Sequence, residues 1–129
     1  MDAELASAFT KLQGKHILIV DDDVLFLRLL TKRFAGHEIH VSQAQSGSNA
    51  VVEIEQNTPD IILLDVELLD MSGLDLATLV RQNDYTKTVP ILFMSGGNHE
   101  ADCLKIPGAD FISKPFALSD LFARLCSLL

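Results

Sequence analysis

Short, continuous apolar runs alternate with longer amphipathic stretches along the chain. The apolar runs predict buried strands at residues 16–20, 38–42, 60–64, 90–94 and 109–112. The stretches that follow them predict helices at residues 23–35, 47–57, 73–83, 98–105 and 117–128. In the first of these, Leu27, Leu30 and Phe34 recur at helical spacing. The pattern therefore indicates a regular alternation of strand and helix.

Turn-forming residues support these boundaries. Gly36 follows the first predicted helix, Ser46 is a suitable N-cap for the second, and Pro90 opens the fourth strand. Apolar strands that alternate with helices are typical of a parallel sheet covered on both faces. We expect an α/β, doubly wound (βα)5 fold, with five parallel strands in the flavodoxin-like order 2-1-3-4-5. Residues 1–14 precede it as an N-terminal extension, and residues 15–129 form one domain.

Composition and charge narrow the classes of partner. Apolar residues make up 48% of the 129 residues, and the net charge is −8, so we expect neither a nucleic-acid nor a membrane partner. No apolar run approaches the roughly 18 to 20 residues of a membrane span. The opening MDAELASAFTKLQG lacks the basic start and apolar core of a signal peptide. We expect a cytoplasmic protein in which Cys103 and Cys126 are buried, unpaired thiols.

Polar residues that carry chemistry stand at the carboxyl ends of the predicted strands. They are Asp21 and Asp22 after the first strand, Asp65 after the third, Ser95 after the fourth and Lys114 after the fifth. In a doubly wound sheet these ends meet at one edge. Carboxylates gathered there repel one another unless a cation neutralises them, and oxygen ligands favour Mg²⁺. A metal, a lysine and a hydroxyl around a carboxylate indicate a site for phosphoryl transfer to that carboxylate.

Each of these residues also has a simpler structural explanation. The aspartates after the first strand could cap the helix that follows, although one is enough and Asp23 is the better candidate. Asp65 could be an ordinary loop acid and Ser95 a helix cap. The ordered occurrence of suitable residues at four strand ends favours the phosphoryl-transfer site.

The ordered motifs resemble those of response regulator receiver domains, which are phosphorylated in bacterial two-component signalling. The matching motifs are ILIVDDD, DIILLD, DMSGLDL, VPILFMSG and GADFISKPF. They extend over nearly the whole chain, from His16 to Leu129, so the resemblance identifies residues 15–129 as the receiver domain.

The resemblance implies a metal ligand set. Asp65 would be the phosphoacceptor, and Asp65 and Asp22 would bind Mg²⁺ directly. The backbone carbonyl of Glu67 would be a third ligand, whereas Asp21 would act through metal-bound water. The domain would catalyse only its own phosphorylation and dephosphorylation, and would not otherwise be an enzyme.

The resemblance also implies a switch. Ser95 would hydrogen-bond the phosphoryl group and Lys114 would pair with it, while the Lys114–Pro115 bond matches a step that is often cis in the family. Phosphorylation adds roughly −1.5 to −2 charges. Ser95 would move towards them and leave space for the ring of Phe111, unless Phe111 is simply a core aromatic that never moves. The surface formed by residues 98–105, 109–112 and 117–128 would then change.

Partners follow from the same resemblance. The phosphodonor would be a sensor histidine kinase or a histidine phosphotransfer protein, and a downstream protein would recognise the changed surface, which could also form a phosphorylation-dependent homodimer. The chain ends at its last predicted helix and its opening looks like a native start. The chain is then either a stand-alone receiver or the receiver of a longer regulator or hybrid kinase, and its opening favours the stand-alone form.

The sequence departs from the common family pattern in the loop after the acceptor. Leu69 stands where proline is usual, which predicts a more mobile loop. Glu67 places a carboxylate at the mouth of the site, where we expect it to tune the lifetime of the aspartyl phosphate in a direction that the sequence leaves open. The four histidines have no metal-site spacing, and we expect solvated or edge positions for His16, His37, His40 and His99.

Two other classes of function remain as alternatives. One is an interaction module of receiver architecture that is never phosphorylated, against which the intact set of site residues argues. The other is an enzyme of the haloacid-dehalogenase type, which also forms an aspartyl phosphate and carries an acid two residues later, as Glu67 does. That enzyme class carries its nucleophile on the first strand, whereas Asp65 follows the third.

Overall fold

One parallel sheet forms the centre of the molecule, and its strands follow the order β2-β1-β3-β4-β5. The computed structural model describes residues 3–129. The strands are β1 (His16–Val20), β2 (His40–Ala44), β3 (Ile61–Asp65), β4 (Ile91–Ser95) and β5 (Ala109–Ser113). This order confirms the predicted α/β, doubly wound, flavodoxin-like fold.

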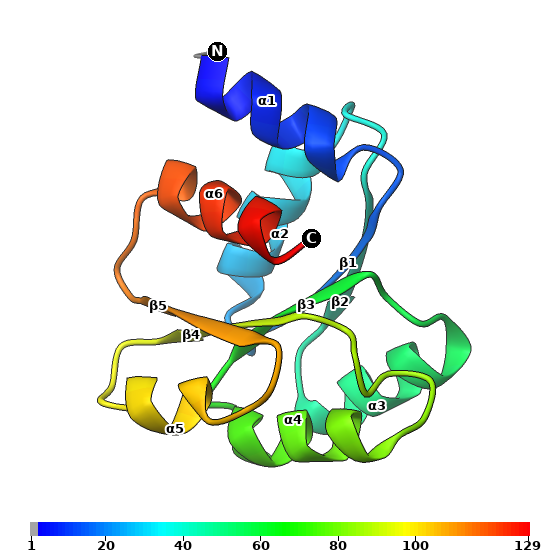
Figure 1. Ribbon diagram of the computed structural model, residues 1–129, viewed down its shortest axis with the longest axis vertical. Helices are drawn as coiled ribbons and strands as arrows, with labels where there is room; N and C mark the ends of the chain where they lie inside the picture. Colours follow the sequence, from blue (N-terminus) through cyan, green and yellow to red (C-terminus); the bar gives the residue numbers. More distant parts are fainter. Residues whose placement is uncertain (1–2) are drawn as a thin grey trace.

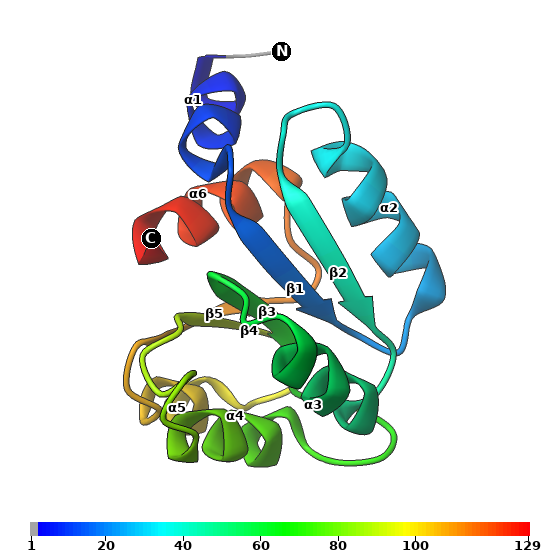
Figure 2. The same ribbon diagram turned by 90° about the vertical axis from the view of Figure 1, so that its right-hand side faces the viewer.

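Helices cover both faces of this sheet (Figures 1 and 2). They are α1 (Ala3–Leu12), α2 (Val24–Phe34), α3 (Gly47–Gln56), α4 (Gly73–Gln82), α5 (Glu100–Leu104) and α6 (Leu118–Leu128). Helices α1, α2 and α6 pack on one face, and α3, α4 and α5 pack on the other. The helix at residues 3–12 was not among the predicted elements.

Alternation along the strands divides the core between the two faces. In β1, Leu18 and Val20 pack towards α3, α4 and α5, whereas Ile17 and Ile19 pack towards α1, α2 and α6. Every residue of β1, β3 and β4 is buried. These strands are apolar over most of their length because helices cover both of their sides.

Helix α1 contributes an aromatic side chain to the second of these core layers. Phe9 is only 5% exposed, and its ring centroid lies 5.2 Å from that of Phe122 and 6.3 Å from that of Phe34. The ring of His37 stacks on Phe9 at 4.1 Å with an angle of 6° between the planes. The first helix of the chain is therefore built into the core.

Local signals fix most helix ends where the sequence predicted them. Asp23 caps α2 by accepting hydrogen bonds from the backbone N–H groups of Leu25 and Phe26, at 3.1 and 3.2 Å. Ser46 caps α3. Strand β2 begins at His40, two residues later than predicted, because Glu38 still lies in the turn with a positive φ of 59°.

Other expectations have mixed outcomes. Both cysteines are free thiols, Cys103 buried and Cys126 half-buried. The prediction of solvated or edge histidines is wrong for His16, which is buried in β1 and has its Nε2 atom 2.7 Å from Oγ of Ser42. Within residues 3–129, none of the helices combines the length and the apolar character that crossing a membrane requires.

Candidate functional site

Three aspartates converge at the carboxyl edge of the sheet. Asp21 follows β1, Asp65 ends β3, and Asp22 lies beside them. One oxygen from each carboxylate lies within 4.8 Å of the others. Asp21 and Asp65 are buried and Asp22 is half-buried, so the carboxylates repel one another in a partly desolvated pocket. The chemistry of this donor set fits a hard divalent cation such as Mg²⁺.

Backbone contacts hold two of these carboxylates in place. Asp21 Oδ1 accepts a hydrogen bond from the backbone N–H of Asp23 at 2.9 Å. Asp65 Oδ1 accepts one from the backbone N–H of Glu67 at 3.0 Å. The start of α4 packs directly against the end of β3, where a Cβ atom on Gly73 would collide with the carbonyl oxygen of Asp65. The end of β3, and with it the position of Asp65, is thus held against the start of α4.

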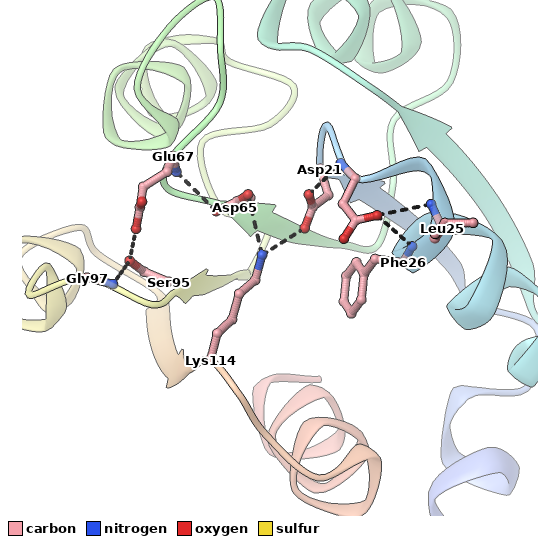
Figure 3. A network of polar contacts seen from close by, with 9 residues as sticks. Asp21, Leu25, Phe26, Asp65, Glu67, Ser95, Gly97 and Lys114 are labelled. Atoms are coloured by element: carbon pink, nitrogen blue, oxygen red, sulfur yellow. Dashed lines mark hydrogen bonds and ion pairs between the residues drawn. The ribbon is translucent and has the colours of Figure 1, made fainter.

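Lys114 brings a positive charge to the aspartates (Figure 3). Its Nζ atom lies 3.1 Å from Oδ2 of Asp21 and 3.4 Å from Oδ2 of Asp65, and 5.4 Å from the ring centroid of Phe26. Burial acts to lower the pKa of Lys114, but the hydrogen bonds and charges of Asp21 and then Asp65 outweigh it and raise that pKa. The lysine therefore stays charged.

The pKa of Asp21 is raised as well, which for a carboxyl group favours the neutral form. Burial raises the pKa of Asp21, the nearby charge of Asp65 adds to this, and hydrogen bonds from the Asp23 backbone and Lys114 offset only part of it. Among the described residues of this pocket, three carboxylates thus face one lysine. The remaining negative charge favours a bound cation.

Ser95 ends β4 and is fully buried. Its hydroxyl donates a hydrogen bond to Oε1 of Glu67 at 2.8 Å and accepts one from the backbone N–H of Gly97 at 2.9 Å (Figure 3). Sequence reasoning placed Ser95 and Glu67 at the same site but did not predict this contact. The two residues are 28 positions apart on different loops, and no spacing rule joins them.

The remaining predicted residues lie beside this centre. Phe111 is buried in β5 and packs with Phe93 in the core layer that faces α3, α4 and α5. The Lys114–Pro115 peptide bond is cis, as the family resemblance implied.

An aspartate that sequence reasoning missed anchors the loop after Asp65. Asp70 accepts hydrogen bonds from the backbone N–H of Gly47 at 2.9 Å, and from the backbone N–H and the hydroxyl of Ser48 at 3.0 and 2.7 Å. These bonds, that from the Ser48 hydroxyl first, lower the pKa of Asp70 to about 2. Leu69 is 92% exposed, yet the loop around it is tied to the start of α3. A DxxG pattern before a helix does not itself signal such a long-range contact.

Comparison with known proteins places this site in a family. A family model described as response regulator receiver domain matches residues 17–126. Phosphate regulon transcriptional regulatory protein PhoB of Pseudomonas aeruginosa is 33% identical over 121 residues, which cover 90% of this chain and 52% of PhoB. Transcriptional regulatory protein TrcR of Mycobacterium tuberculosis is 34% identical over 120 residues, 88% of this chain and 45% of TrcR. The chain thus spans about half the length of these relatives.

Solved structures agree with the fold. Chemotaxis response regulator CheY4 of Vibrio cholerae superposes with a TM-score of 0.82 at 22% identity, covering 89% of this chain and 98% of CheY4. Response regulator protein TrrA of Thermotoga maritima, solved in complex with Mg²⁺ and BeF, superposes with a TM-score of 0.77 at 26% identity, covering 89% of this chain and 99% of TrrA.

Proposed function

Because the chain belongs to the response regulator receiver domain family of two-component signalling, we propose that it accepts a phosphoryl group on Asp65 in the presence of Mg²⁺. The observation that carries this proposal is the arrangement around Asp65. Its carboxylate shares a pocket with those of Asp21 and Asp22, and Nζ of Lys114 lies 3.4 Å away. That combination neutralises charge on a phosphoryl group as it reaches a carboxylate.

Each side chain has a part in this chemistry. Asp22, Asp65 and the backbone carbonyl of Glu67 would hold Mg²⁺, which when bound neutralises charge on the carboxylates and on the incoming phosphoryl group. Asp21 holds the ammonium group of Lys114 beside Asp65. The N–H of Glu67 fixes the rotation of the Asp65 carboxylate by binding Oδ1.

The output that we propose is a change of surface. Ser95 and Lys114 would turn to the phosphoryl oxygens, and the space around Phe111 would change with the loop that follows β4. Helix α5, strand β5 and helix α6 would then present an altered face to a downstream protein or to a second copy of the chain. The proposal concerns the receiver alone, since PhoB and TrcR are about twice as long as the part that matches.

A histidine kinase or a histidine phosphotransfer protein is the phosphodonor that we propose. An apolar groove beside the site, between α2 and the loop before α6, is lined by Phe26, Leu29, Phe116 and Leu118. Such a groove suits the apolar face of a donor helix that carries its histidine towards Asp65. The free thiols of Cys103 and Cys126 support the cytoplasmic location that we propose.

Intact-mass measurement tests the acceptor directly. The protein is incubated with Mg²⁺ and acetyl phosphate beside an Asp65→Asn variant. We expect one phosphoryl group on the parent protein and none on the variant. No modification of the parent by any small donor, together with no Mg²⁺ binding, would leave an interaction module that is never phosphorylated. Equal modification of the variant would mean that Asp65 is not the acceptor.

The dehalogenase-type enzyme is not the function that we propose. Asp65 ends β3 rather than β1, and the family match covers residues 17–126. Both observations favour the receiver.

A further inference from the structure

The hydroxyl of Ser95 has two hydrogen-bond partners within the protein itself. It donates to Oε1 of Glu67 at 2.8 Å while it accepts from the N–H of Gly97 at 2.9 Å. A serine hydroxyl has one proton to donate. While the hydroxyl donates this proton to Glu67, it cannot donate a full hydrogen bond to a phosphoryl oxygen on Asp65.

We propose that Glu67 is a positioning residue that holds Ser95 in the arrangement of the unphosphorylated domain. Phosphorylation would then require an exchange of acceptors, from the Glu67 carboxylate to the phosphoryl oxygen. This inference rests on the proposed function of Asp65, and it gives a direction to the effect of Glu67 on that function: the carboxylate opposes the phosphorylated state.

The two acceptors that Ser95 would exchange are similar in hydrogen-bond strength. A hydrogen bond to a carboxylate is stronger than one between neutral groups, so Ser95 has a strong partner in the resting state. A phosphoryl oxygen is likewise anionic and can replace it. The Glu67 side chain is 56% exposed, so water can solvate its carboxylate once Ser95 leaves.

The loop after β4 leaves room for the Glu67 carboxylate. A Cβ atom on Gly97 would lie 3.1 Å from Oε1 of Glu67 and 3.0 Å from two ring atoms of His99. These distances are tighter than ordinary van der Waals contact. A side chain at position 97 would therefore push the carboxylate or the imidazole aside.

The contact also joins two loops that the proposed switch must move. Glu67 belongs to the loop between β3 and α4, whereas Ser95, Gly97 and His99 lead from β4 into α5. Nε2 of His99, directly before α5, lies 3.9 Å from Oε1 of Glu67. Release of Ser95 would therefore remove one of the two contacts through which Glu67 joins the loop after β3 to the segment that leads into α5.

Repulsion between the Glu67 carboxylate and an anionic phosphoryl group would also oppose phosphorylation. The experiment must therefore separate this repulsion from the hydrogen bond between Ser95 and Glu67. Removal of Glu67 takes a negative charge away from the site whether or not Ser95 is bound to it. A double-mutant cycle with Ser95→Ala isolates the hydrogen bond, because repulsion remains when the hydroxyl is absent. Glu100→Ala is the matched control, since it removes an exposed acid at the start of α5 that has no described contact with Ser95.

The measurement is the affinity for beryllium fluoride in the presence of Mg²⁺, by titration calorimetry on the full chain. We expect Glu67→Ala to bind about fivefold more tightly than the parent. Glu67→Gln, which keeps an oxygen acceptor without the charge, should fall between them. In the Ser95→Ala background the gain from Glu67→Ala should be smaller. An equal gain in both backgrounds, or no gain in the parent background, would overturn the proposal.

Amide hydrogen exchange in the unliganded protein gives a second, independent readout. We expect Glu67→Ala and Ser95→Ala each to speed exchange at Gly97 and at the start of α5, with little further change in the double variant. Parent protein that binds no beryllium fluoride would refute the phosphoacceptor function, and the exchange data would then judge the hydrogen bond by itself. Tight binding without any coupling in either measurement would refute the role of Glu67 and leave the phosphoacceptor function standing.

Discussion

The burial of Phe9 predicts that α1 contributes a large share of the stability of the domain. The ring is 5% exposed and lies against Phe122, Phe34 and His37. Truncation of a buried phenylalanine to alanine costs about 3 to 5 kcal/mol. Because single helices can open locally without global unfolding, the loss cannot exceed the free energy that holds α1 on the rest of the domain. We therefore expect Phe9→Ala to lower the free energy of unfolding by about 3 kcal/mol, at the lower end of that range.

Thermal and urea unfolding, followed by circular dichroism, measure this loss. We expect the midpoint temperature of Phe9→Ala to fall by about 10 °C for a domain of this size. Ser7→Ala is the matched control, because Ser7 is exposed on the same helix and its replacement should change stability by less than about 0.5 kcal/mol. A loss below about 1 kcal/mol for Phe9→Ala would refute the packing of α1 into the core.

Three further predictions concern the site and its loops. Gly73→Ala should destabilise the protein by at least about 2 kcal/mol, because the added Cβ would collide with the carbonyl oxygen of Asp65. Gly96→Ala is the control: its Cβ would lie 4.0 Å from the Cβ of Lys114, so the melting temperature should change little. The lowered pKa of Asp70 means that its carboxylate stabilises the fold above the ordinary pKa of 3.8 and loses that effect as the pH falls to about 2. The difference in unfolding free energy between the parent protein and Asp70→Asn, measured in urea, should therefore shrink over that interval. A difference that stays unchanged down to pH 2 would contradict this prediction. Mg²⁺ at a hundred times its dissociation constant should add about 2.7 kcal/mol, and a chelator should reverse this; the same gain in Asp22→Asn would show that the ion binds elsewhere.

The architecture could be predicted because most strands are buried on both faces. Strands β1, β3 and β4 each contain four consecutive apolar residues. Strand β2 is the more exposed of the two edge strands: only its last residue is buried, whereas β5 at the other edge buries two. Its weaker pattern explains why its start was misplaced by two residues.

Helix α1 was missed although the sequence carried its signal. Leu5, Ala8, Phe9 and Leu12 follow the spacing of one helical face. A helix of ten residues is marginal on its own, and what stabilises this one is its packing on α6 and α2. The larger part of that packing is on α6, which lies more than a hundred positions away along the chain.

The membership of the site could be predicted, but the direction of its side chains could not. The topology of a doubly wound sheet brings Asp21, Asp65 and Lys114 to one edge whatever their rotamers. The hydrogen bond from Ser95 to Glu67 instead depends on side-chain torsions and on the path of two loops. Such contacts follow from geometry that no residue pattern encodes.

The position of α1 against α6 also bears on the kinetics of folding. Ala8 in α1 accepts a hydrogen bond through its carbonyl from the thiol of Cys126 in α6, although 118 positions separate them. Contacts between such distant segments require the largest loop closure, so they form late. Interactions that are absent from the folding transition state slow unfolding and leave the folding rate nearly unchanged. We therefore expect helix α1 to affect how long the folded domain persists more than how quickly it forms.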